Sequence, residues 1–171
     1  MGDNIWLADR DSVRTPMQWT PDRNAGFSTA DPGQLYLPVN QSLVHNFTTI
    51  NVEAQLAQPT SLLHWVHGML DIRRQHPVFG VGDFRVLRCD NEAILAFLRS
   101  SPAETLLCVA NLATTPRSAT LSLPDHAGQL LFDVFGGAPF PQIGQGGEMT
   151  VMLGSRDFFW LTVTPPGPED G

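Results

Sequence analysis

Apolar and polar residues alternate along the second half of the chain. From residue 84 onward, apolar side chains tend to recur at every second position, the period of a strand with one buried face. Turn residues such as Asp90-Asn91 and Thr114-Thr115-Pro116 separate these segments. Short strands at this spacing favour an antiparallel β-sandwich. The predicted strands are residues 84–89, 93–99, 105–112, 118–123, 129–133, 148–153 and 158–164.

A helical period precedes the strands. Leu62, Val66 and Met69 follow the spacing of one helix face, and Pro77 disfavours a helical conformation at the residue before it. The pattern predicts one helix over residues 59–76. Residues 1–57 are rich in turn residues yet carry several aromatic side chains, which predicts an irregular segment that packs against something. The proline-rich residues 165–171 are typical of a flexible tail or linker.

The composition is that of a globular protein of low charge, with 42% hydrophobic and 16% charged residues and a net charge of −7. Every cation is an arginine and no basic cluster is present, which argues against nucleic-acid and membrane-surface partners. No segment resembles a signal peptide or a membrane span, so a cytoplasmic location is expected. Asn40-Gln41-Ser42 and Asn46-Phe47-Thr48 match the glycosylation acceptor but are interpreted as chance matches. Cys89 and Cys108 are expected to be buried thiols.

Two groups of side chains are candidates for chemistry on their own. Asp9 and Asp11 suggest the paired carboxylates of glycoside hydrolysis, but neighbours on one loop rarely oppose each other across a scissile bond. His64 and His67 lie three residues apart on the predicted helix and could share a metal ion. No third ligand stands at a matching offset, so no metal and no other cofactor is expected.

Four other stretches are too specific to be explained by composition. They are Arg14-Thr15-Pro16-Met17-Gln18-Trp19, Asn24-Ala25-Gly26-Phe27, Ile50-Asn51-Val52-Glu53-Ala54-Gln55 and Arg73-Arg74-Gln75-His76-Pro77. Through these stretches, the chain resembles the carboxyl-terminal portion of the α-amylase superfamily, in the branch of oligo-1,6-glucosidases, sucrose-acting enzymes and trehalose synthases. Residues 2–7 and 131–144 are most similar to the trehalose synthase group.

The resemblance implies a fold, because this superfamily combines a (β/α)8 barrel with a following β-sandwich. Residues 1–57 then correspond to the loop region after the eighth barrel strand, and residues 58–79 to the last barrel helix. Residues 80–164 correspond to the carboxyl-terminal β-sandwich, and residues 165–171 to a tail. The expected fold is mainly β: an antiparallel sandwich preceded by one α-helix and a long irregular segment from the end of a barrel.

The resemblance also implies an activity for a longer parent protein. Trehalose synthases interconvert maltose and trehalose through a covalent glucosyl-enzyme, using two Asp and one Glu from earlier parts of the barrel. No residue of this chain matches those three, so we expect a fragment without turnover of its own, and whether the chain is itself an enzyme stays open. The family commonly has a methionine before the Gly2-Asp3-Asn4 stretch, which makes Met1 a candidate internal residue.

One substrate contact is carried over by the resemblance. Arg14 corresponds to an arginine that helps bind the non-reducing glucose, where its guanidinium can fork onto neighbouring hydroxyls and pair with a barrel Asp. The alternative is a structural arginine that satisfies loop carbonyls. Asp22, Arg23 and Asn24 are expected at the rim of the same mouth.

The expected partners follow from the missing barrel. Without it, the loop segment and helix expose apolar surface, so we expect self-association or a disordered first segment. In some relatives the enzyme associates with a maltokinase, which makes such a kinase a second candidate partner. The alternative function is a non-catalytic carbohydrate-binding or assembly β-sandwich from an oligo-1,6-glucosidase or sucrose-hydrolase relative. Its candidate sugar platform is the aromatic set Phe132, Phe135, Phe140, Phe158, Phe159 and Trp160.

Overall fold

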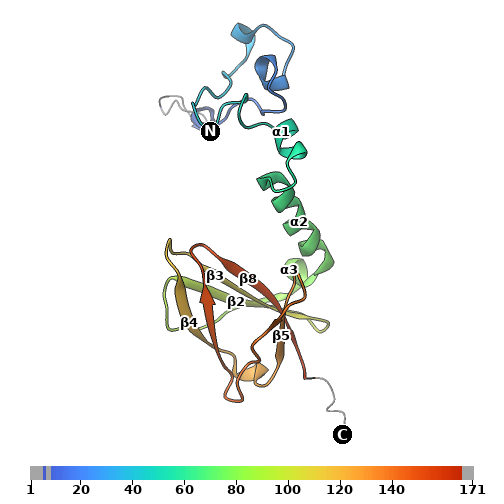
Figure 1. Ribbon diagram of the computed structural model, residues 1–171, viewed down its shortest axis with the longest axis vertical. Coiled ribbons are helices and arrows are strands. Elements are labelled where there is room, and N and C mark those ends of the chain that lie inside the picture. Colours follow the sequence, from blue (N-terminus) through green and yellow to red (C-terminus); the bar gives the residue numbers. More distant parts are fainter. Residues whose placement is uncertain (1–5, 7–8, 167–171) are drawn as a thin grey trace. The chain divides into compact units, whose positions relative to one another are not determined.

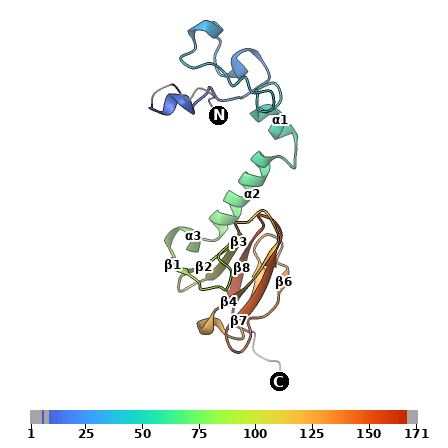
Figure 2. The same cartoon turned by 90° about the vertical axis from the view of Figure 1, so that its left-hand side faces the viewer.

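The computed structural model describes residue 6 and residues 9–166 (Figures 1 and 2). Met1, most of the stretch 2–7 and the tail residues 167–171 therefore lie outside the described residues. The chain divides into two units, Met1–Leu70 and Asp71–Gly171. Within the described residues, none of the helices has both the length and the apolar character needed to cross a membrane.

The second unit contains two antiparallel sheets (Figure 1). One has six strands in the order β1-β2-β3-β8-β5-β6, and the other pairs β4 with β7. All seven predicted strands are present, and the short β6, bounded by prolines and glycines, was not predicted. A 3-10 turn, Pro124–His126, lies between β4 and β5. The strands are β1 Asp83–Val86, β2 Ile94–Ser100, β3 Thr105–Asn111, β4 Arg117–Ser122, β5 Leu130–Asp133, β6 Pro139–Phe140, β7 Glu148–Leu153 and β8 Phe158–Thr164.

The main core lies between the two sheets. Burial alternates along β7, where every second residue from Met149 to Leu153 is buried and the residues between them are exposed. This period of two confirms the antiparallel sandwich expected from the sequence. The fully buried members of the core include Leu98, Leu107, Val109, Leu121, Leu123, Leu131, Ile143, Leu153 and Leu161.

The short helix α3, Val78–Val81, packs on part of the opposite face of the larger sheet, against β2 and β8. Val78 and Leu106 are buried although neither belongs to the main core. The Phe79 ring lies against Trp160 on β8, with ring centroids 4.7 Å apart, and the Arg99 Nε donates to the Val78 carbonyl at 3.2 Å. The chain leading into β1 therefore forms part of the second unit.

Two side chains extend this contact. The His76 Nδ1 lies 2.5 Å from the Glu104 carboxylate, which ties the residue after α2 to the turn before β3. Cys108 pairs with Trp160 across the β3–β8 ladder and is buried, as expected. Burial raises the pKa of the Cys108 thiol to about 12, so this sulfur stays protonated and unreactive.

The predicted long helix is α2, Leu62–Gln75, which begins three residues later than expected. It begins at Leu62 because the Ser61 hydroxyl accepts from the His64 amide and the Gln55 side chain accepts from the Leu63 amide. None of its 14 residues is buried. Isolated helices shorter than roughly 12–15 residues are marginal in water, so α2 needs a covering surface. Its most exposed large apolar side chains are Leu62, Trp65, Val66 and Leu70.

The first unit is irregular up to residue 51, with 3-10 turns at Asp9–Ser12, Arg23–Gly26 and Pro32–Gln34. The prediction of an irregular segment over 1–57 misses the helix α1, Val52–Ala57. Asn51 starts this helix, because its side-chain oxygen accepts from the Ala54 amide at 2.8 Å. The helix is only six residues long, too short for a periodic signal.

Candidate functional site

Backbone hydrogen bonds hold the Gln18-Trp19 stretch between two other parts of the first unit. The Trp19 amide donates to the Ala25 carbonyl at 2.8 Å, on one side of this stretch. On the other side, the amides of Val52 and Glu53 donate to the carbonyls of Gln18 and Trp19 at 2.9 and 3.0 Å. The Gln18 side-chain amide also donates to the Ile50 carbonyl. The first and third family stretches are thus joined directly.

In the first unit, buried asparagine side chains form hydrogen bonds with backbone groups that lie outside helices and strands. Asn24 is 5% exposed, and its amide donates to the carbonyls of Ser28 and Ala30 at 3.0 and 2.8 Å. Its backbone has a φ of 55°, a left-handed conformation that asparagine tolerates better than most residues. Asn51 is 3% exposed and donates to the Phe47 carbonyl while it caps α1. Each amide satisfies backbone groups that have no partner in a helix or strand.

The two stretches that match the glycosylation acceptor form local turns. The Ser42 amide donates to the Asn40 side-chain oxygen at 2.8 Å, and the Thr48 amide donates to that of Asn46 at 3.0 Å. An asparagine that accepts from the amide two residues ahead forms an Asx turn. The sequence analysis missed this role, although the Asn-x-Ser/Thr spacing itself was the signal.

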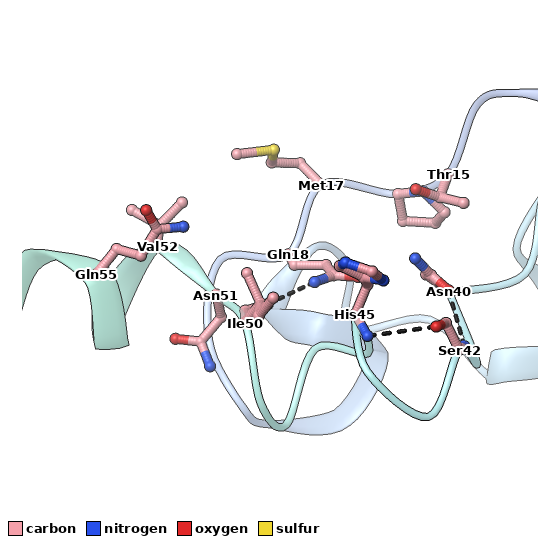
Figure 3. A pocket seen from close by; sticks show the side chains of 11 residues that line it. Thr15, Met17, Gln18, Asn40, Ser42, His45, Ile50, Asn51, Val52 and Gln55 are labelled. Carbon is pink, nitrogen blue, oxygen red and sulfur yellow. Dashed lines mark hydrogen bonds between the residues drawn. The ribbon is translucent and has the colours of Figure 1, made fainter. Parts of the chain in front are cut away.

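These turns surround a pocket of about 590 Å³ (Figure 3). Its wall combines apolar side chains with amides, hydroxyls and one imidazole, and none of the described residues that line it is Asp, Glu, Lys or Arg. Some polar groups are already engaged: the Gln55 oxygen accepts from the Leu63 amide at 3.0 Å, and both ends of the Asn51 amide are bonded. The lining residues are Thr15, Pro16, Met17, Gln18, Asn40, Ser42, His45, Ile50, Asn51, Val52 and Gln55.

The four residues proposed for substrate binding do not line this pocket. Arg14 is exposed, and its guanidinium makes no hydrogen bond or ion pair within the described residues. The exposed Asp22 carboxylate accepts from the Thr20 hydroxyl at 3.0 Å. Arg23 lies 3.6 Å from Asp31 in an exposed ion pair, and Asn24 is buried in its own loop. Their expected role at a sugar-binding mouth stays a prediction.

Of the candidate carboxylates Asp9 and Asp11, only the side chain of Asp11 is described. The Asp11 carboxylate accepts from the Tyr36 hydroxyl at 2.8 Å. This hydrogen bond, with the negative charge of Asp11, raises the pKa of the exposed Tyr36. Because the neutral phenol is favoured in the folded state, its small contribution to stability is present at neutral pH and is lost as pH rises through the raised pKa.

The histidine pair His64 and His67 gains no third metal ligand within the described residues. The His64 Nε2 lies 3.1 Å from the Leu56 carbonyl, which occupies one ring nitrogen. Among residues 6 and 9–166, no group of three or more His, Cys, Asp or Glu side chains could hold a metal ion.

The aromatic residues of the sandwich mostly contact one another. Ring centroids of Phe135 and Phe158 lie 5.4 and 6.0 Å from that of Trp160. Phe140 and Phe159 pack together at 4.8 Å against the main core. Among the six aromatic residues of the suggested sugar platform, Phe135 alone is exposed. This arrangement gives little flat aromatic surface for a sugar.

Two protein families match the chain, one after the other. Residues 2–82 match the alpha amylase catalytic domain, and residues 84–160 match the maltogenic amylase C-terminal domain.

Similar proteins include several trehalose synthases. The trehalose synthase of Pimelobacter sp. is 46% identical over 170 residues, which are 97% of this chain and 30% of that protein. The trehalose synthase/amylase TreS of Mycolicibacterium smegmatis is also 46% identical, over 100% of this chain and 30% of its own length. Among solved structures, trehalulose synthase MutB from Pseudomonas mesoacidophila MX-45 gives a TM-score of 0.67 at 30% identity, covering 91% of this chain and 26% of that one.

The chain spans about 30% of the length of these two trehalose synthases. Its matched part begins in a catalytic domain and ends in a carboxyl-terminal β domain. The motifs that suggested this origin lie in the first unit and at the end of α2, whereas the strands of the second unit agree with the second family match. The chain belongs to the α-amylase family and corresponds to the carboxyl-terminal portion of its trehalose synthases.

Proposed function

We propose that this chain is the carboxyl-terminal part of a trehalose synthase-like enzyme that interconverts maltose and trehalose by intramolecular glucosyl transfer. The observation that carries the proposal is the 46% identity to trehalose synthases over nearly the whole chain. In this proposal the nucleophile and the acid/base carboxylates belong to parts of the enzyme outside the chain. The described Asp side chains of the first unit support this, because Asp11, Asp22 and Asp31 are each engaged by a different hydroxyl or arginine.

The exposed α2 helix supports a missing barrel as the main partner. A 14-residue helix with no buried residue has a driving force for folding only if its apolar side chains are covered. Residues 2–82 match a catalytic domain, so we infer that the remainder of that domain covers α2.

In the proposed enzyme, the first unit forms one wall of the sugar pocket. The guanidinium of Arg14 has no partner among the described residues, and its planar fork suits two adjacent hydroxyls of a bound glucose. Closing such a pocket excludes water, and this decides whether the covalent glucosyl group passes back to glucose or is hydrolysed. The hydrogen bonds around Gln18 and Trp19 keep the loop rigid beside Arg14.

A chimera tests the proposed activity. The chain replaces the matching segment of the Mycolicibacterium smegmatis protein, and trehalose and glucose formed from maltose are measured. We expect the chimera to form trehalose. We expect no product from the chain alone, or from the Mycolicibacterium smegmatis protein after deletion of the matching segment. Turnover by the purified chain alone, or a folded chimera that forms no trehalose, would contradict the proposal.

Self-association of the isolated chain is expected from the same helix. Leu62 and Leu70 are 68% and 50% exposed, and exposed apolar faces of this kind drive association. Sedimentation velocity should show species larger than the 18.7 kDa monomer. Leu62→Glu combined with Leu70→Glu should restore the monomer, whereas Met152→Glu, at a 77% exposed position of β7, should not. A monomer at all concentrations would refute this expectation.

The sandwich gives little support to the alternative function of a carbohydrate-binding or assembly module, because its aromatic rings pack against one another. Association with a maltokinase and a cytoplasmic location stay predictions.

A further inference from the structure

The pocket in the first unit has the size and the chemistry of a ligand site. Its volume of about 590 Å³ lies within the roughly 300–1,000 Å³ typical of small-molecule sites. It is formed by three stretches of chain, residues 15–18, 40–45 and 50–55, which approach one another only in the folded unit.

Asn40 is the residue that singles out this pocket. It is 5% exposed, and its side-chain oxygen is used by the Ser42 amide. Its side-chain nitrogen has no hydrogen-bond partner among the described residues, and it points away from Ser42 on the pocket side (Figure 3). None of the described buried side-chain nitrogen and oxygen atoms lacks a partner, so this nitrogen is open to solvent and can donate to an acceptor that enters the pocket.

Other polar groups of the wall complete the set that a polyol needs. The Ser42 hydroxyl oxygen accepts from the amides of Val44 and His45 at 3.3 Å, which leaves its own proton available for donation. The imidazole of His45 is exposed and makes no hydrogen bond within the described part of the chain, so it can donate with one nitrogen and accept with the other. The Gln18 nitrogen is engaged, and its oxygen stays available as an acceptor.

The remaining wall determines which class of ligand fits. Pro16, Met17 and Ile50 give the pocket an apolar side, suited to the C–H face of a pyranose ring. None of the described lining residues carries a permanent charge, so none of them compensates a phosphate, a carboxylate or an ammonium group. Charged ligands are therefore disfavoured, and neutral polyhydroxylated ones are favoured.

We propose that this pocket binds one neutral glucose unit, with Asn40 and His45 as its main hydrogen-bonding residues. Arg14 does not line this pocket. The choice of glucosides as probes rests on the proposed function, whereas the preference for a neutral polyol comes from the pocket itself.

The test is a binding titration of the full chain, followed by NMR, with maltose, trehalose, glucose and inorganic phosphate. We expect saturable shifts of residues in the pocket wall with at least one of the sugars and none with phosphate. Asn40→Ser should weaken sugar binding about tenfold, because it removes one amide donor. The serine hydroxyl can still accept from the Ser42 amide, whose chemical shift reports whether the turn is kept.

His45→Ala should weaken binding by a similar factor, and His67→Ala should leave it unchanged, because His67 lies on α2 and does not line the pocket. The proposal is overturned if no sugar shifts the pocket residues, if phosphate competes, or if Asn40→Ser and His45→Ala bind as the unchanged chain does. Binding is measured on the chain without turnover, so the two proposals can fail separately. If the chain binds no sugar but the chimera forms trehalose, this site alone is refuted. If the chain binds sugar but the chimera forms no trehalose, the proposed function alone is refuted.

Discussion

Arg14→Ala should lower kcat/KM for maltose by roughly 10²–10⁴-fold in the chimera with the Mycolicibacterium smegmatis protein. A charged group that donates two hydrogen bonds to a sugar contributes about 1.5–3 kcal/mol with each bond. Losing both corresponds to at least a hundredfold, since about 1.4 kcal/mol changes a rate tenfold. Steady-state kinetics of trehalose formation from maltose gives the comparison.

Two further variants separate binding from a structural role of Arg14. Arg14→Lys keeps the charge but loses the planar fork, so it should recover only a small part of the activity. Arg117→Ala, at an exposed position of β4, is the matched control and should leave kcat/KM unchanged. If Arg14 only satisfies loop carbonyls, Arg14→Ala will lower the melting temperature while kcat/KM changes less than threefold, and the substrate contact is then wrong.

Leu161→Ala should destabilise the sandwich by about 2–5 kcal/mol. Leu161 is fully buried on β8, a strand that pairs with both β3 and β5, and it belongs to the main core. Removing its side chain leaves a cavity between two sheets that cannot collapse easily. For a unit of about 100 residues this corresponds to a fall in melting temperature of roughly 10–20 °C or more.

Calorimetry of the full chain measures this change. The control is Met152→Ala, because Met152 points outward from β7 and is 77% exposed. Its substitution should change the free energy of unfolding by less than about 0.5 kcal/mol. Equal effects of the two substitutions would show that the two sheets do not form a packed core.

The sandwich could be predicted from the sequence because burial on one face of a strand leaves a pattern of period two. Residues 148–153 show it clearly, and the structure has β7 at the same bounds. β6 has only two residues and α1 only six, so neither is long enough to produce a period. The start of α2 was misplaced, since the capping hydroxyl of Ser61 is helped by a side chain from outside the helix, Gln55.

The candidate pocket could not be predicted in the same way. Its wall comes from three stretches that are joined by hydrogen bonds such as that from the Val52 amide to the Gln18 carbonyl. Asn40 was visible only as part of an Asn-x-Ser match, and nothing local reveals that one end of its amide is engaged and the other free. Local patterns report a residue's own backbone, whereas a site depends on which distant residues meet.

The way α3 lies against the larger sheet bears on how carboxyl-terminal domains could be exchanged between relatives. The boundary between the two family matches falls at residues 82–84, but the second unit begins at Asp71. A graft cut at the family boundary would leave behind Val78 and Phe79, and with them the ring contact to Trp160 and the hydrogen bond from Arg99. The module that can be exchanged therefore includes the end of the preceding helix, α2. Recombination upstream of residue 71 keeps the contact between α3 and the larger sheet, whereas recombination at residue 83 would remove α3 and expose that part of the sheet.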